Sequence, residues 1–395
     1  MYLFVPYSVA GHVYPMLPVL SELANRGNRL RVIVDERYAP AVRAVGAEVV
    51  CLGEVLDVFV PERVSGRFSA RFLAGRLRRL GMNRRAGLLL DRELRRLDGR
   101  GVVVVDPMLG WADRVVRRHR VPAAIFSTTF HQGADALAEM ARQDGLPTPR
   151  WMHRVRPLVR RYERSGRLVL ANSVAELDPV GQTPARDVHL VGPLLRPRDE
   201  ASAIREPAGD RVLFVSPGTV FARGRSFFDR FVRAFAGRPW QVYLATGHLD
   251  PADLGPLPPN VVARRFWPQL QLLARSDVFV THAGMNSVLE GLSAGVPMLL
   301  FPRSAEQRHL ARCLVAGGVG VRPGSGNANP ADLYGLVDAL AADQAVRAAA
   351  RAWQARLGVG GGPRRAADLL EAWAGAQPGS LGGSSTDPSA SSPAV

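Results

Sequence analysis

Short hydrophobic runs, each followed by a turn and a stretch with helical periodicity, recur along the first half of the chain. Runs of this kind, without alternation of apolar and polar positions, are typical of strands buried on both faces of a parallel sheet. Alternation of strands and helices therefore predicts an α/β domain. Its predicted strands are 2–6, 30–34, 49–52, 102–105, 123–128, 168–171 and 188–190.

The same pattern returns after a polar, charged and proline-bearing stretch, which predicts a linker between two domains. The length of 395 residues suits two domains that each have their own core. We expect strands at 212–216, 242–246, 261–266, 278–281, 298–301 and 319–321. The predicted division is 1–194, linker 195–210, second domain 211–363, a helix at 364–374, and a tail at 375–395 whose Gly, Ser, Pro and Thr content predicts disorder.

The two cysteines, Cys51 and Cys313, lie far apart in the sequence and indicate no disulfide framework. This usage fits a reducing cytoplasm. No apolar run approaches the roughly 20 residues of a membrane-spanning helix, and the first residues have the pattern of a strand rather than of a signal peptide. We therefore expect a cytoplasmic protein without an integral membrane segment.

The net charge of +16 is concentrated in two stretches, 61–100 and 142–167, and every basic residue is arginine. A nucleic-acid partner would explain such patches, but no aromatic-basic recognition module accompanies them, so we expect none. An anionic acceptor, a lipid surface and a solvated helix face remain alternative explanations of the arginines.

A strand-turn-helix near residue 282 carries the densest group of candidate binding residues. His282 follows a predicted strand, Gly284 lies in the turn, and Asn286 and Ser287 begin the helix. Free N–H groups and the helix dipole attract an anion at such a turn. Glu290 lies one helical turn beyond Asn286, so a diphosphate with its ribose against Glu290 would suit this group of side chains. The alternative is that these residues only cap the helix and end the strand.

In type and spacing these residues resemble the nucleotide-sugar signature of GT-B glycosyltransferases, in the family (family 1) that includes macrolide glycosyltransferases. Glu306 and Gln307 match the acidic-Gln pair of that signature, which contacts the sugar. The resemblance covers about 1–373 and implies two Rossmann-like domains that face each other across a cleft. The first domain would hold the acceptor and the second the nucleotide sugar, with the last helix crossing back to the first domain.

His12 lies where the first strand gives way to a helix, a common place for chemistry in α/β sheets. The sequence Gly11-His12-x-x-Pro15 resembles the catalytic histidine loop of the family, and Gly11 is assigned to the donor site. A neutral imidazole is a suitable base for a hydroxyl near pH 7. Asp106 ends the strand 102–105 and would orient His12 and stabilise its protonated form, as in a catalytic triad. The alternative for both residues is a helix cap.

Two further turns of the second domain are expected to contact the donor. A glycine turn follows its first strand, where backbone amides could meet phosphate or sugar. The second turn resembles the base-binding motif of the family, although Phe266 stands where tryptophan is usual and would stack less strongly on a base. The residues assigned to the donor here are Ser216, Gly218, Thr219, Phe266, Trp267 and Gln269.

In the resembling family the variable region after the third strand lines the acceptor cleft. The acceptor candidates are Phe59, Met82, Met108, Trp111, Phe130 and His131. Packing in the core explains the apolar members of this set equally well.

The resemblance implies an inverting glycosyltransferase that moves a sugar from a UDP- or dTDP-sugar to a hydroxyl of a natural-product aglycone, such as a polyketide or macrolide antibiotic. No Asp-x-Asp is present to hold Mg²⁺, so we expect no metal and no cofactor besides the nucleotide-sugar co-substrate. Alternatives are a transferase acting on a lipid-linked or anionic acceptor, a catalytically silent protein that activates a partner, and a nucleotide-sugar epimerase. The sugar, the aglycone and the oligomeric state, a homodimer included, stay open.

Overall fold

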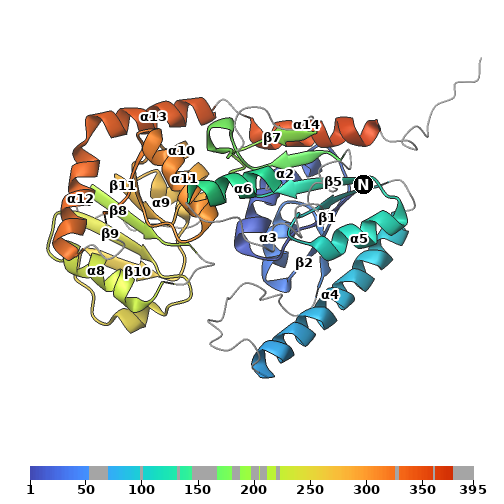
Figure 1. The fold of residues 1–395 in the computed structure, drawn as a ribbon, viewed down its shortest axis with the longest axis horizontal. Coiled ribbons are helices and arrows are strands. Elements are labelled where there is room, and N and C mark those ends of the chain that lie inside the picture. Colours follow the sequence, from blue (N-terminus) through green and yellow to red (C-terminus); the bar gives the residue numbers. More distant parts are fainter. Residues whose placement is uncertain are drawn as a thin grey trace, which may run out of the picture.

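The computed structural model describes residues 1–52, 70–97, 101–130, 134–144, 167–179, 187–196, 204, 211–218, 223–324, 329–358 and 361–376. Its strands form two parallel sheets in two domains that lie side by side (Figure 1). The first sheet contains β1 (Tyr2–Val5), β2 (Leu30–Val34), β3 (Glu48–Cys51), β4 (Val102–Val105), β5 (Ala123–Ser127), β6 (Val169–Ala171) and β7 (Val188–Leu190). The second contains β8 (Arg211–Ser216), β9 (Trp240–Ala245), β10 (Val261–Arg264), β11 (Val278–Thr281), β12 (Met298–Leu300) and β13 (Gly320–Val321).

Helices connect the strands and cover both faces of each sheet. Those of the first half are α1 (Ala10–Val13), α2 (Leu17–Asn25), α3 (Ala39–Ala44), α4 (Ala70–Arg96), α5 (Gly110–His119) and α6 (Ala134–Gln143). Those of the second half are α8 (Arg225–Phe235), α9 (Gln269–Leu273), α10 (Met285–Ala294), α11 (Ala305–Ala316), α12 (Pro330–Ala342), α13 (Gln344–Gly358) and α14 (Gly362–Gly375). Short 3-10 turns lie at η1 (Tyr14–Met16), η2 (Glu36–Tyr38), η3 (Ala175–Leu177) and η4 (Pro251–Leu254).

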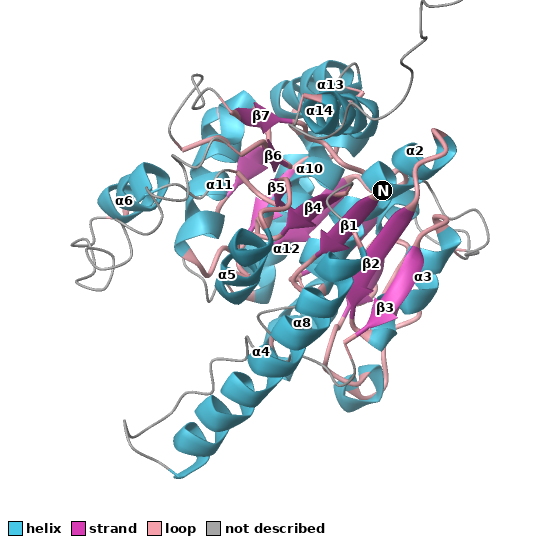
Figure 2. Ribbon diagram, turned by 90° about the vertical axis from the view of Figure 1, so that its right-hand side faces the viewer, coloured by secondary structure: helices cyan, strands magenta, loops and turns pink. Residues whose placement is uncertain are grey.

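Both sheets reverse their direction of growth at one point. The first has the order β3-β2-β1-β4-β5-β6-β7, so the chain moves outward from β1 to β3 and then resumes at β4 on the other side of β1 (Figure 2). The second, with the order β10-β9-β8-β11-β12-β13, reverses in the same way between β8 and β11. Loops that leave such a point in opposite directions open a crevice at the carboxyl ends of the two strands.

Burial on both faces explains why the strands are apolar without alternation. β4 consists of four buried valines, whose branched side chains suit a packed sheet. On one face of the first sheet Leu20 of α2 packs into the core, and on the other Leu90 of α4 does so. In the second domain α10 and α13 cover one face, while α8 and α12 cover the other. The predicted α/β architecture of two parallel sheets is confirmed.

The last helix, α14, packs against α2 of the first domain (Figure 1). Leu370 is fully buried in the core of that domain. Arg26, beyond the end of α2, pairs with Asp368 and Glu371, each at 2.7 Å. The entry into α14 is tight, because a Cβ at Gly362 would lie 2.5 Å from the carbonyl oxygen of Val191.

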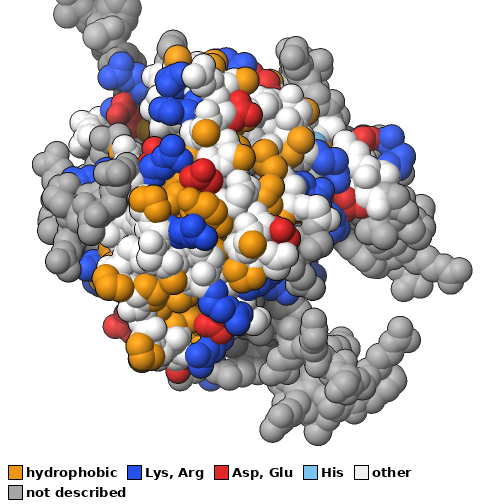
Figure 3. Space-filling view, turned by 90° about the vertical axis from the view of Figure 1, so that its left-hand side faces the viewer, with side chains coloured by type: hydrophobic (Ala, Val, Ile, Leu, Met, Phe, Trp, Pro, Cys, Tyr) orange, Lys and Arg blue, Asp and Glu red, His pale blue; other side chains and the backbone are white. Residues whose placement is uncertain are grey.

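The face of the second domain seen in Figure 3 carries basic, acidic and hydrophobic side chains interspersed with one another. By contrast, the exposed side of α4 in the first domain includes Arg84, Arg85, Arg92, Arg95 and Arg96. This helix extends away from the body of the molecule (Figure 2). In the described part of the chain, no helix has both the length and the apolar character needed to cross a membrane.

We predict that Gly362→Ala destabilises the protein by about 1–3 kcal/mol, because the added methyl group would meet two backbone carbonyls that cannot move independently. The matched control is Gly335→Ala in α12, where an added Cβ meets nothing within 4 Å and helix propensity favours alanine by up to about 1 kcal/mol. Urea unfolding of the two variants measures the difference. Equal stability of both variants would contradict the tight entry into α14.

Candidate active site

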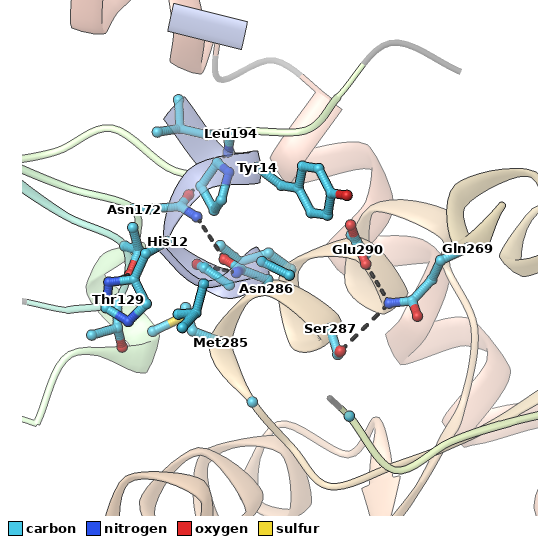
Figure 4. A pocket seen from close by; sticks show the side chains of 18 of the residues that line it. His12, Tyr14, Thr129, Asn172, Leu194, Gln269, Met285, Asn286, Ser287 and Glu290 are labelled. Carbon is cyan, nitrogen blue, oxygen red and sulfur yellow. Dashed lines mark hydrogen bonds between the residues drawn. The ribbon is translucent and has the colours of Figure 1, made fainter. Parts of the chain in front are cut away.

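A cavity of about 510 Å³ lies where the carboxyl edges of the two sheets meet (Figure 4). Both domains contribute side chains to its walls. The first domain supplies residues that include Tyr7, Gly11, His12, Tyr14, Met108, Thr129 and Asn172. The second supplies residues that include Ser216, Gly218, Phe266, Trp267, Gln269, His282, Gly284, Asn286, Ser287, Glu290, Glu306 and Gln307.

His12 and Asp106 form a hydrogen-bonded pair at the reversal point of the first sheet. The Nδ1–H of His12 donates to Oδ2 of Asp106 at 2.7 Å, and Asp106 is fully buried. The other oxygen, Oδ1, accepts the backbone N–H of Met108 at 2.9 Å, so the carboxylate also stabilises the turn before α5. Because Asp106 accepts the proton of Nδ1, Nε2 of His12 keeps its lone pair and can act as a base.

The surroundings of His12 favour its protonated form. Burial of the imidazole disfavours protonation, but the charge and hydrogen bond of Asp106 and the charge of Glu306 outweigh it, so the pKa of His12 is raised. About a quarter of the side chain, 24 %, remains exposed. A base whose pKa moves toward the working pH is more effective in proton transfer.

Glu306 and Gln307 lie in the first turn of α11, which starts with a capping box. Ser304 accepts the backbone N–H of Gln307 at 3.2 Å, and Oε1 of Gln307 accepts the backbone N–H of Arg303 at 2.8 Å. Glu306 reaches the first domain, where it accepts the hydroxyl of Thr129 at 2.9 Å. Burial raises the pKa of Glu306, although Thr129 and His12 oppose this. The amide NH₂ of Gln307 and the carboxyl of Glu306 are thus the groups that a ligand could contact here.

His282 ends β11 at the reversal point of the second sheet and is enclosed by two glycines. A Cβ at Gly218 would lie 2.5 Å from the imidazole, and one at Gly284 would lie 2.4 Å from it. Burial, aided by the charge of Arg223, lowers the pKa of His282 to about 4, so the ring is neutral near pH 7. Its Nδ1 is buried and has no hydrogen-bond partner among the described residues. A bound ligand would satisfy such an atom.

Polar side chains of β8, α9 and α10 form hydrogen bonds with one another on the far side of the cavity (Figure 4). Gln269 donates to the carboxyl of Glu290 and to the hydroxyl of Ser287, the latter at 3.4 Å, and accepts the hydroxyl of Ser216 at 3.3 Å. Burial raises the pKa of Glu290 to about 7, against the opposing effects of Arg196 and Gln269.

The structure distinguishes the two adjacent aromatic residues of the base-binding motif. Phe266 lines the cavity and is 65 % exposed. Trp267 also borders the cavity, but its indole N–H donates to the carbonyl of Leu244 at 2.9 Å and its ring packs edge-on against Tyr243. Trp267 is therefore anchored to the sheet, and Phe266 is the ring with a free surface for stacking.

The structure places only some of the acceptor candidates at the cavity. Met108 lines the cavity. Phe130 does not: its ring is fully buried between the domains and packs against His309, which explains why this candidate lies in the core rather than at the cavity. Trp111 packs on the core cluster beneath β1 and β4, outside the cavity lining. The predicted residues Phe59, His131 and the donor candidate Thr219 lie outside the described residues, and so does the side chain of Met82.

Several cavity residues were missed by the sequence analysis. Asn172 follows β6 directly, a strand-end position that could have revealed it. Tyr14 and Arg196 meet at the cavity, where the guanidinium lies 4.0 Å from the centre of the tyrosine ring. Arg196 belongs to the predicted linker, and no local pattern there indicates a binding residue. Met285, at the start of α10, also lines the cavity.

Among the described side chains, no group of three or more His, Cys, Asp or Glu is arranged to hold a metal ion. Independence from metal ions stays a prediction.

We predict that Asp106→Asn lowers the pKa of His12 by about 1 to 3 pH units, because it removes an opposite charge at hydrogen-bond distance. Titration of the imidazole C–H resonances by NMR measures this. The matched control, Asp91→Asn, removes a carboxylate from a different histidine, His119, and should leave the titration of His12 unchanged. An unchanged pKa of His12 in the Asp106→Asn variant would refute the pairing.

Comparison with known proteins places this geometry in a family. Residues 242–370 match the family model described as the C-terminal domain of erythromycin biosynthesis protein CIII-like proteins. The chain is 30 % identical to the oleandomycin glycosyltransferase of Streptomyces antibioticus, over 93 % of this chain and 89 % of the relative. It is 25 % identical to the NDP-glycosyltransferase YjiC of Bacillus subtilis (strain 168), over 92 % of this chain and 94 % of the relative.

A solved structure shows the same architecture. The calicheamicin glycosyltransferase CalG4 superposes with a TM-score of 0.72 at 31 % identity, covering 95 % of this chain and 98 % of that protein. Identity and fold agree over nearly the whole length of the chain. The protein is therefore a nucleotide-sugar glycosyltransferase with the GT-B fold and belongs to the macrolide-type glycosyltransferases of family 1.

Proposed function

We propose that the protein transfers a sugar from a UDP- or dTDP-sugar to a hydroxyl of a natural-product aglycone of the polyketide or macrolide type, with inversion at the anomeric carbon. The observation that carries this proposal is the hydrogen-bonded pair of His12 and Asp106 in a cavity whose opposite wall holds the predicted donor residues.

In the proposed step, Nε2 of His12 takes the proton of the acceptor hydroxyl while its oxygen bonds to the anomeric carbon. The bond between that carbon and the diphosphate oxygen breaks, and both of its electrons leave with the diphosphate. Direct displacement on one face inverts the configuration. Asp106 keeps the imidazole in the tautomer that the step requires and stabilises the imidazolium that forms.

Negative charge grows on the diphosphate as it leaves, and the start of α10 is the proposed place to bind it. The free backbone N–H groups of this helix and its dipole attract anions. Ser287 offers a hydroxyl in the first turn of α10, and the neutral ring of His282 offers a hydrogen bond rather than a charge. Stabilisation of this kind, by groups already in place, is an effective way to lower a barrier.

The nucleotide would lie along the wall formed by Phe266, Gln269 and Glu290. The exposed ring of Phe266 suits stacking on a pyrimidine, and Glu290 suits a hydrogen bond from the pentose. A carboxylate accepts hydrogen bonds equally from a ribose diol and from a single hydroxyl, so UDP and dTDP both fit. Glu306 and Gln307, near His12, would hold hydroxyls of the sugar.

The acceptor class rests on the relatives. The names of two of the compared proteins refer to oleandomycin and calicheamicin, which supports a natural-product aglycone. The YjiC relative carries a broader name, NDP-glycosyltransferase, so the experiment below includes aglycones of more than one class.

We predict that His12→Ala loses about 10²- to 10⁴-fold in turnover, because it removes the general base, and keeps its nucleotide affinity. Purified protein is incubated with UDP- and dTDP-sugars and a panel of macrolide and polyketide aglycones, and products are followed by mass spectrometry. Calorimetry with UDP and dTDP gives the nucleotide affinities. The matched control is His248→Ala, an exposed histidine on the turn after β9, which should behave as wild type.

Turnover of His12→Ala at the wild-type rate would overturn the assigned base. Absence of transfer by the wild-type protein from every donor, together with intact nucleotide binding, would instead favour the catalytically silent alternative.

We predict that a nucleotide sugar binds about tenfold more weakly at pH 6 than at pH 8, because the pKa of Glu290 is raised to about 7 and only the ionised carboxylate accepts the pentose hydroxyl freely. As pH falls through 7, the ionised fraction drops and affinity drops with it. UDP-glucose and dTDP-glucose suit the measurement, since their diphosphate diester does not titrate in this range. Glu290→Gln, matched in shape, should bind with little dependence on pH, and a wild-type dependence that survives in this variant would exclude Glu290 as its origin.

A further inference from the structure

Three hydrogen bonds in series lie beside the cavity, and two of them cross between the first domain and the second (Figure 4). The backbone N–H of Leu194 donates to Oδ1 of Asn172 at 3.0 Å. Nδ2 of Asn172 donates to Oδ1 of Asn286 at 3.1 Å, and Nδ2 of Asn286 donates to the carbonyl oxygen of Gly11 at 2.7 Å. We call this series the asparagine bridge.

The two ends of the bridge determine the orientation of both amides. The carbonyl of Gly11 can only accept, so the atom of Asn286 that faces it must be the nitrogen. The N–H of Leu194 can only donate, so the atom of Asn172 that faces it must be the oxygen. The remaining contact is then a nitrogen of Asn172 against an oxygen of Asn286, which is a good hydrogen bond. If either amide were flipped, like atoms would face each other.

The bridge joins three parts of the molecule that the proposed reaction must align. Gly11 directly precedes His12, the proposed base. Asn286 is the second residue of α10, where the diphosphate is proposed to bind. Leu194 lies next to the stretch that connects the domains. Asn172 is 1 % exposed and touches two of these parts directly.

The bridge is compatible with a bound nucleotide. The amide of Asn286 has two N–H donors, and Gly11 uses one of them. The second remains for a phosphate oxygen at the start of α10. Asn286 can therefore serve the donor site and the bridge together.

We infer that Asn172 is a positioning residue: through Asn286 it sets the place of the donor helix α10 relative to the His12 loop, and so aligns the base with the anomeric carbon. This inference rests on the proposed function. A misplacement of about 1 Å between reacting groups can cost about a hundredfold in rate, so a buried amide that sets this alignment should influence turnover more than nucleotide binding.

The change Asn172→Asp tests the inference with little change in shape. The carboxylate still accepts the N–H of Leu194, but it cannot donate to Asn286, where two oxygens would now face each other. The matched control is Asn329→Asp. Asn329 caps α12 by accepting the N–H of Asp332, a role that aspartate fills equally well.

We predict that Asn172→Asp lowers kcat by about 10- to 100-fold, while the Kd for UDP or dTDP changes by less than about threefold and Asn329→Asp matches wild type. Rates are compared per folded molecule, at a temperature where circular dichroism shows both variants folded. Amide hydrogen exchange is followed in the same samples without ligand. Peptides that cover residues 8–16 should exchange faster in Asn172→Asp, and those that cover β8 and β9 should not.

Wild-type kcat in Asn172→Asp, or a loss of nucleotide affinity as large as the loss of kcat, would overturn the inference. Unchanged exchange over residues 8–16 would overturn it as well. This exchange measurement needs no acceptor, so it separates the inference from the proposed function: if the wild-type protein transfers no sugar at all, the proposed function fails, while exchange still decides whether the bridge holds the His12 loop.

Discussion

The active-site cavity depends on one constraint of parallel sheets: with right-handed crossovers, all strands end at one edge, and the loops diverge where the strand order reverses. In the first sheet that point lies between β1 and β4, which lead to His12 and Asp106. In the second it lies between β8 and β11, which lead to Gly218 and His282. The two edges face each other, so residues from both crevices, His12 from one and His282 from the other, line a single cavity.

This constraint also explains which parts of the site the sequence could predict. His12 and Asp106 are 94 residues apart, yet Asp106 directly follows β4 and His12 lies in the short helix that follows β1, and parallel topology brings such positions together. The same holds for the turn at His282. Phe130 and Trp267 show the opposite case. Both are aromatic residues near strand ends, but contacts with His309 and with the carbonyl of Leu244, distant in sequence, decide that one ring is buried and the other anchored. The local sequence pattern around an aromatic residue does not show which distant residues its ring will contact.

Polar groups around the cavity form hydrogen bonds with one another, both between the domains and within each domain. Glu306 accepts from Thr129, and Glu290 accepts from Gln269. Each of these bonds uses one carboxyl oxygen, Oε1 of Glu306 and Oε2 of Glu290, so the second oxygen of each group can accept a ligand hydroxyl. Such a hydrogen bond replaces one with water and contributes little net free energy. Much of the binding energy would then come from stacking and from the diphosphate. The polar contacts would mainly select among sugars and nucleotides, because a ligand that breaks a bond without replacing it leaves a buried group unpaired.

The charges around the two histidines differ in a way that suits the proposed displacement. His12 lies near the carboxylates of Asp106 and Glu306, which stabilise added positive charge. His282 lies near Arg223 and is held neutral, in surroundings that disfavour positive charge on the ring and favour a bound anion. The proposed transfer would move a proton onto the first histidine and negative charge onto the leaving diphosphate beside the second. Each charge would develop where the protein already holds the opposite sign, so little reorganisation is needed during the step. That benefit requires the two domains to keep their relative place, which is why an uncharged amide bridge between them bears on a reaction dominated by charge.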